Sequence, residues 1–357
     1  MALRIDQGTD LVLNVHLRPS GRAEDIQPTV GLYFTDHPAT LHPMLLEIEN
    51  DAALKIPAGA AHFPVTDTFT LPIGVDVMAV YPHAHYLGKD LAATATFPDG
   101  TIKTLIHIPH WDVNWQAVYN YAHPVFLPKG TKVTMRYSYD NSANNPFNPN
   151  HPPKLVEGGN RAADEMAHLW LQVLPHPEKP LSEDPRMILQ EALSRHEVEK
   201  DPANFEAQYN LAAMLAKRNE LPEAVQHYAA AARIRPHDAV VNNALGSMLL
   251  ADGSVDEAIR HLQDAVQARP TYFDAHYNLA LALASKNEFA GAAEQFRQAL
   301  EIHPDDGNAH ANFGSALAQL GRLAEAKVQF ETALQMNPEN KLARENLALV
   351  NQMLAGR

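Results

Sequence analysis

Two histidines separated by one residue end an apolar run of this chain, and a methionine lies far downstream of them. They are His83 and His85, with Met166 in the segment Asp164-Glu165-Met166. On a β-strand, residues two apart project to the same side, so both imidazoles can reach one ion. Imidazole and thioether donors together suit reduced copper, whereas magnesium and calcium prefer oxygen donors. We therefore predict a copper site that uses His83, His85 and Met166.

The setting of Met166 distinguishes this hypothesis from a chance pairing among the 19 histidines of the chain. In the run 166–174, alanine, leucine and valine side chains alternate with Met166, His168, Trp170 and Gln172. A methionine that served only as core would share the leucine face. The same alternation in the run 10–17 directs His16 away from the apolar side of its strand.

Length and composition exclude several classes of function. A chain of 357 residues is long enough for two or three domains. Its net charge is −14 and its basic residues do not cluster, which excludes nucleic acid as a predicted partner. The lack of cysteine excludes disulfides, thiolate metal sites and cysteine nucleophiles. No apolar stretch is long enough for a membrane span, and no hydrolase or nucleotide-binding motif is present.

The second half of the chain contains a repeat, because prolines recur every 34 residues from Pro202 to Pro338. That is the period of the tetratricopeptide repeat, in which small residues let the two helices of a hairpin approach closely. An all-α solenoid is predicted over 186–357. It consists of a leading helix 186–200, four repeats at 205–238, 239–272, 273–306 and 307–340, and a capping helix 341–355.

The concave face of this solenoid is the predicted binding surface for a protein or peptide. Asparagines recur there at one register, at positions 210, 278, 312 and 346, with Asn243 one residue earlier in its repeat. Such side chains can hydrogen-bond an extended peptide backbone, or they can tie the helices together. The basic residues needed to clamp a C-terminal carboxylate are missing at these positions.

The first half, residues 1–175, is predicted to be an all-β sandwich or jelly roll. Short alternating or apolar runs lie near 10–17, 29–35, 61–71, 75–83, 91–97, 101–108, 115–121, 131–139 and 166–174. A proline-rich linker, 176–185, separates the two halves, because closely spaced prolines block both helix and central strand.

Four segments of this half occur in an order that resembles a known family. They are His83-Ala-His85-Tyr-Leu-Gly88, Trp111-Asp-Val-Asn-Trp-Gln116, Tyr139-Asp-Asn141 and Asp164-Glu-Met166. With them, residues 9–175 resemble the C-terminal domain of the copper type II, ascorbate-dependent monooxygenases. This family includes the peptidylglycine α-hydroxylating and dopamine β-monooxygenases. Fusion of such a domain to tetratricopeptide repeats is typical of a bacterial protein.

The resemblance implies two copper ions, with ascorbate or another reductant as the electron source. The oxygen-binding copper of the family is held by a His-x-His pair and a methionine, which correspond here to His83, His85 and Met166. The electron-donating copper has three histidine ligands, and the last corresponds to His16 in Asn14-Val-His16. The other two form an adjacent pair, which this sequence does not contain. Either the chain is truncated upstream or the second site is lost.

Positions that contact substrate in the family differ here. Tyr81 stands where the peptide hydroxylases have an arginine, and His168 and Trp170 replace a polar asparagine and tyrosine. The resemblance therefore leaves the substrate unknown. Two functions remain: a copper-dependent monooxygenase module with a docking solenoid, or a non-catalytic repeat scaffold with a degenerate copper domain. A complete enzyme of this kind is expected in the periplasm or outside the cell, although no signal peptide is visible and a cytoplasmic location stays open.

Overall fold

A computed structural model describes residues 43–161, 163–177, 179, 181 and 183–355 of the chain. The strands predicted at 10–17 and 29–35, together with His16, lie outside these described residues. Within the described part, no helix is both long enough and apolar enough to cross a membrane.

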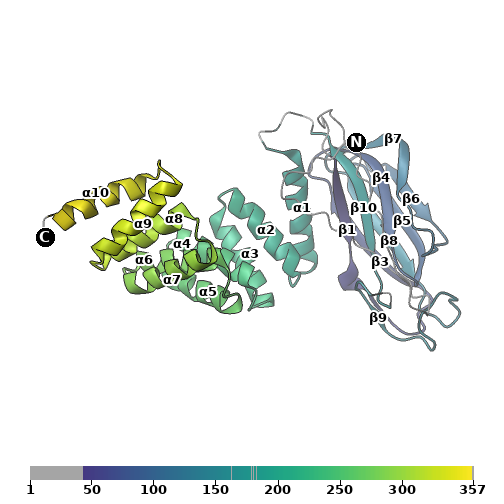
Figure 1. The fold of residues 1–357 in the computed structure, drawn as a ribbon. Helices are drawn as coiled ribbons and strands as arrows, with labels where there is room; N and C mark the ends of the chain where they lie inside the picture. Colours follow the sequence, from purple (N-terminus) through teal and green to yellow (C-terminus); the bar gives the residue numbers. More distant parts are fainter. Residues whose placement is uncertain (1–42, 162, 178, 180, 182, 356–357) are drawn as a thin grey trace, which may run out of the picture. The chain divides into compact units, whose positions relative to one another are not determined.

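The β region consists of two four-stranded antiparallel sheets, which confirms the predicted sandwich class (Figure 1). The first sheet has the order β1 (Met44–Glu49), β10 (His168–Pro175), β4 (Val75–His83), β7 (Tyr119–Leu127). The second has the order β3 (Phe63–Thr70), β8 (Lys132–Tyr139), β5 (Gly88–Thr96), β6 (Ile102–Ile108). A small ladder pairs β2 (Lys55–Ile56) with β9 (Val156–Glu157), and a 3-10 turn covers Asp51–Ala53.

Alternation of side chains explains why these segments pair as a sandwich. In β10, Leu169, Leu171 and Val173 are buried in the apolar core, whereas the residues between them face the other side of the sheet. The second sheet contributes Tyr137 and Tyr139, both fully buried. Their hydroxyls donate hydrogen bonds of 2.7 Å to the carbonyl oxygens of residues 168 and 166, respectively. The two sheets are thus joined by polar contacts at the start of β10.

Helix α1 (Pro185–Lys200) packs with the β region over its first part, up to His196. Leu189 and Leu193, one turn apart, lie in the same apolar core as the strands, and His196 Nε2 is 2.9 Å from the Oδ1 atom of Asp67. The compact unit accordingly ends at His196. The leading helix predicted at 186–200 is present as α1, and an apolar stripe does not by itself reveal which neighbour covers such a helix.

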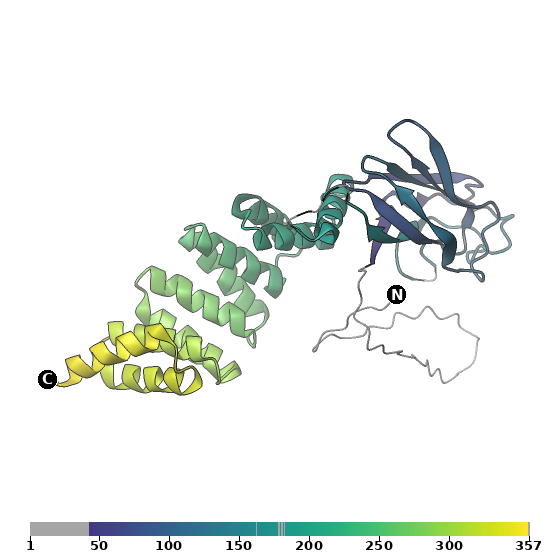
Figure 2. The same cartoon turned by 90° about the horizontal axis from the view of Figure 1, so that it is seen from above.

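The second unit, from Glu197 onward, is built of antiparallel helix pairs (Figures 1 and 2). Each pair follows the last in chain order, and the first helix of every pair begins 34 residues after its predecessor. The pairs are α2 (Phe205–Lys217) with α3 (Leu221–Ile234), α4 (Ala239–Ala251) with α5 (Val255–Ala268), α6 (Phe273–Ser285) with α7 (Phe289–Ile302), and α8 (Gly307–Gln319) with α9 (Leu323–Met336). Helix α10 (Lys341–Ala355) follows.

Small residues permit the close approach within each pair. A Cβ atom added to Gly246 would lie 2.5 Å from Leu262 Cγ, and one added to Gly314 would lie 2.8 Å from Phe330 Cε1. Both partners are completely or almost completely buried. Such contacts are shorter than van der Waals separation, so the glycines are required by packing.

The recurring asparagines connect successive repeats. Asn278 Nδ2 donates to Asn243 Oδ1 at 3.0 Å, Asn312 Nδ2 to the Tyr277 hydroxyl at 2.9 Å, and Asn346 Nδ2 to Ser315 Oγ at 3.1 Å. Of the two roles considered for these residues, the one that ties helices together accounts for these bonds.

Replacing Gly314 by alanine is expected to destabilise the solenoid by about 1–3 kcal/mol, because the new methyl group overlaps the Phe330 ring. Gly291→Ala is the matched control, since its nearest contact is the flexible Leu283 side chain at 3.3 Å. That substitution should change stability by less than about 1 kcal/mol, in the stabilising direction. Urea unfolding followed by helical circular dichroism measures both, and equal midpoints for the two variants would contradict the packing argument.

Candidate metal centre

The two predicted histidine ligands lie at the end of β4. His83 is its last residue and His85 follows in the turn toward β5, with side chains that are 6% and 4% exposed. Their ring centroids are 5.2 Å apart and the rings are perpendicular. The structure therefore brings this pair together in a protected position.

Hydrogen bonds define which nitrogen of each ring contacts the protein. His85 Nδ1 is 2.8 Å from the carbonyl oxygen of Asp164, and His83 Nδ1 bonds the Oε1 atom of Gln116. The Gln116 amide nitrogen donates to Val113 O at 3.0 Å, which orients its oxygen toward His83. Both Nδ1 atoms therefore face an oxygen acceptor, and a metal at this site would be met by Nε2 of each ring.

The register between β10 and β4 positions Met166. His168 is paired with His83 at the end of the antiparallel ladder, and Met166 lies two residues before His168 in the adjoining segment. The methionine side chain is 6% exposed, yet among the described residues it is not part of the apolar core that includes the neighbouring Ala167. The side chain is thus buried beside the strand that follows it, and its role as a metal ligand stays a prediction.

Glu165 clamps the two segments together. Its Oε2 atom accepts the backbone N–H of His85 and its Oε1 atom accepts that of Leu87, both at 2.8 Å. The side chain is 1% exposed. Burial raises the pKa of Glu165 to about 8, and the hydrogen bonds from the backbone oppose that rise. The indole nitrogen of Trp111 adds a hydrogen bond of 3.0 Å to the His85 carbonyl. The backbone around His85 is therefore fixed on several sides.

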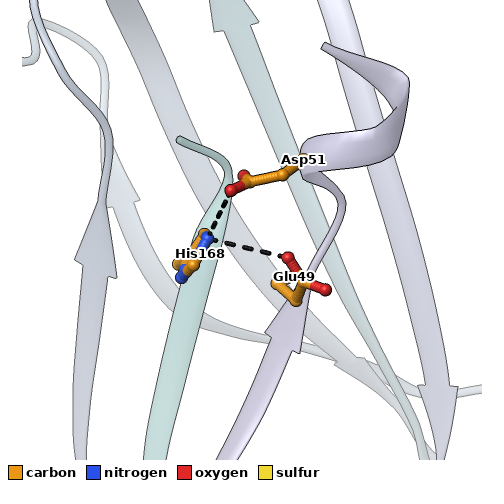
Figure 3. Close-up of side chains that lie close together, drawn as sticks. All are labelled: Glu49, Asp51 and His168. Atoms are coloured by element: carbon orange, nitrogen blue, oxygen red, sulfur yellow. Dashed lines mark hydrogen bonds and ion pairs between the residues drawn. The ribbon is translucent and has the colours of Figure 1, made fainter. Parts of the chain in front are cut away.

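A charged cluster holds the other side of the Met166 segment (Figure 3). Asp51 Oδ1 accepts the N–H of Ala167 at 2.8 Å, and its Oδ2 atom is 2.9 Å from His168 Nε2. Glu49 Oε2 is 3.7 Å from the same nitrogen, and Glu47 Oε1 is 2.8 Å from Nδ1.

Burial favours neutral His168, but its bonds to Asp51 and Glu47 outweigh that effect and raise its pKa to about 10. The ligand atoms of Glu49, Asp51 and His168 lie within 4.8 Å of one another, a spacing that a cation could bridge. Here the imidazolium itself takes that central position. The cluster consequently acts as an anchor for the residues after Met166.

Three positioning residues extend the predicted set. Gln116 occurs in a segment that carried the family resemblance, but its contact with His83 depends on a turn before β7 that the strand pattern did not locate. Glu165 was part of the quoted Asp164-Glu-Met166 motif. The sign that could have indicated its role is an acidic residue directly before the buried strand segment. Asp51 lies in a short turn with no periodic pattern, so nothing in the sequence pointed to it. The donor types of the predicted set, two imidazoles and one thioether, fit copper.

Comparisons with family models agree with both halves of the prediction. Residues 50–179 match the model of the copper type II ascorbate-dependent monooxygenase, C-terminal domain. Residues 188–239, 243–307 and 307–340 match models of the tetratricopeptide repeat. The predicted fusion is thereby confirmed.

Several solved structures are similar to part of the chain. YrrB, described as a tetratricopeptide protein with an unusual peptide-binding site, is 21% identical, with 45% of this chain and 83% of that chain covered and a TM-score of 0.43. MamA from Desulfovibrio magneticus RS-1 is 18% identical, with coverages of 42% and 85% and a TM-score of 0.40. The first repeat domain of Spaghetti (RPAP3), bound to an HSP90 peptide, is 29% identical, with coverages of 33% and 93% and a TM-score of 0.32. No curated protein matches the chain.

Glu165→Gln is expected to destabilise the β unit by about 1–3 kcal/mol. The amide keeps one oxygen, but its nitrogen cannot accept a hydrogen bond, so the N–H of either His85 or Leu87 loses its acceptor. Glu157→Gln makes the same change at an exposed position nearby and should stay within about 0.5 kcal/mol of the wild type. Denaturant unfolding without added copper, followed by tryptophan fluorescence, measures the difference. A Glu165→Gln variant as stable as the control would refute the clamp.

Proposed function

We propose, from the premise that residues 50–179 form a C-terminal domain of the copper type II ascorbate-dependent monooxygenases, that this chain carries the oxygen-binding copper half of such an enzyme. His83, His85 and Met166 would hold the ion. The supporting observation is that the segments bearing these donors run side by side, joined by the bonds of Asp164 and Glu165 to the His85 residue. The repeats would bind a partner protein or peptide on their concave face.

Copper bound here would supply one-electron redox chemistry with dioxygen. In the overall reaction, one oxygen atom enters a substrate C–H bond and the other leaves as water, with two electrons from ascorbate or another reductant and two protons. The protein's own residues prepare the ligands. Gln116 and the Asp164 carbonyl accept from each Nδ1, so coordination through Nε2 would need no proton loss. Three protein ligands leave coordination room for a small molecule.

His16 remains the proposed histidine of the electron-donating copper. The sequence contains no adjacent histidine pair to complete that site. The proposal therefore assigns to this chain the oxygen-binding half, and turnover requires the remaining ligands from elsewhere. We propose that the protein is bacterial. A copper enzyme with an external reductant would then work in the periplasm or outside the cell.

The missing histidine pair favours a second candidate function. In that case the chain is an interaction scaffold, in which the β unit retains the fold and the repeats retain a partner, without catalysis. Ascorbate-dependent oxygen consumption by copper-loaded protein distinguishes the two. If the chain is catalytic, oxygen consumption should rise with copper occupancy and fall in His83→Ala. If it is a scaffold, the wild type and His83→Ala should consume oxygen at the same low rate.

Met166→Leu is expected to lower the Cu(I) affinity at least tenfold, because it removes the sulfur donor and retains a side chain of similar volume. Met353→Leu is the control, since Met353 is 46% exposed on α10. Competition with a chromogenic Cu(I) chelator measures both. Equal affinities for the two variants would remove Met166 from the ligand set and leave the proposal without its soft donor.

A further inference from the structure

An aromatic wall extends from His83 across the outer face of the first sheet. Tyr81 and Trp170 are directly opposite each other in the register of β4 and β10. Their rings are stacked, with centroids 5.1 Å apart and planes 18° from parallel. The His83 ring centroid lies 6.0 Å from that of Tyr81 and 5.9 Å from that of Trp170. One proposed copper ligand therefore borders this wall directly.

The same two rings line a groove of about 560 Å³. This volume is within the range of sites that bind small organic molecules, roughly 300–1,000 Å³. The groove lies between β1, β4 and β10, and Val118 before β7 closes one side. Apolar side chains dominate it, including Met44, Leu45 and Val80.

The charges around the groove restrict what it can bind. None of the described residues that line it is charged, and Gln172 is its single amide side chain. The nearest described charged group by register is Glu47, which is opposite Trp170. Glu47 belongs to the anchor in which three acidic side chains surround the single His168 ring, so acidic groups outnumber basic ones there. A carboxylate in the groove would lose hydration, find no cation and be repelled by this anchor.

Cations are also disfavoured in the groove. Glu47 and Asp51 are already paired with His168, and no acidic side chain lines the groove among the described residues. A buried ammonium group would therefore lose its hydration without a direct partner. Gln172 can donate to or accept from a neutral polar group, such as a hydroxyl.

We propose that this groove binds a small, uncharged, mainly apolar molecule, stacked or packed against Trp170, and that this molecule is the substrate of the copper centre. The second part rests on the proposed copper function. The first part rests on the groove alone and is testable without metal. A substrate seated against Tyr81 and Trp170 would lie beside His83, where the chemistry of the copper site would reach it.

Equilibrium dialysis of the full-length protein tests the chemical class with three naphthalene compounds of one size. These are 2-(1-naphthyl)ethanol, 1-naphthylacetate and 2-(1-naphthyl)ethylamine, which are neutral, anionic and cationic at pH 7. The neutral compound is expected to bind at least tenfold more tightly than either charged one. Tighter or equal binding of a charged compound would overturn the proposed class.

Variants at two tryptophans test the location. Trp170→Ala should lose at least tenfold in affinity for the neutral compound, and Trp170→Phe, which retains a ring, should stay within about threefold of the wild type. Trp115→Ala is the control, because Trp115 is 73% exposed and does not line the groove. Unchanged binding in Trp170→Ala would overturn the location, with circular dichroism used to establish that each variant is folded.

The two proposals fail separately. Binding of the neutral compound to copper-free protein, with no measurable Cu(I) binding, would preserve the groove and refute the copper function. Cu(I) binding without any binding of the neutral compound would refute the groove and preserve the metal site. Where both are present, the neutral compound should change the electron paramagnetic resonance spectrum of the Cu(II)-loaded protein. An unchanged spectrum at saturating ligand would overturn the link between the groove and the copper centre.

Discussion

The candidate metal centre depends on one buried carboxylate. Glu165 accepts two backbone N–H groups from the turn after β4, and its own neighbours in the chain are Asp164, which bonds the His85 ring, and Met166. A carboxyl group that is 1% exposed loses its hydration, and these bonds offset part of that cost. Without the Glu165 contacts, the turn that carries His85 and the segment that carries Met166 would lose two of the hydrogen bonds that join them.

The surrounding structure supports that contact from three directions. Tyr139 from the second sheet binds the Met166 carbonyl, Trp111 binds the His85 carbonyl, and Asp51 binds the N–H of Ala167. Each bond ends on backbone, so the positions of the donors are set by the main chain as well as by side-chain packing. Such support is what a metal site requires when its geometry must exist before the ion arrives. In the repeats, by contrast, the 34-residue period and the small residues at recurring positions determine how neighbouring helices pack.

Strands, helices and site residues could be predicted from the sequence where a regular apolar pattern or a motif marks them, and seldom elsewhere. The strand 75–83 agrees with β4, and helix pairs recur at the predicted interval, because each has a regular apolar pattern. Strand β7 was predicted at 115–121 and lies at Tyr119–Leu127, since it contains Pro124 and several exposed residues that obscure its alternation. Gln116 and Asp51 could not be assigned roles, because their contacts join segments that no local pattern relates. The contacts of Leu189 and Leu193 with the β core likewise join segments that no local pattern relates.

The central claim is that two imidazoles and one thioether of this chain bind the same copper ion. X-ray absorption at the copper edge of the Cu(I)-loaded, full-length protein tests this claim most directly. The account predicts nitrogen scatterers typical of imidazole together with one sulfur scatterer, and loss of the sulfur contribution in Met166→Leu. A wild-type spectrum with no sulfur, or a sulfur contribution that persists in that variant, would contradict it.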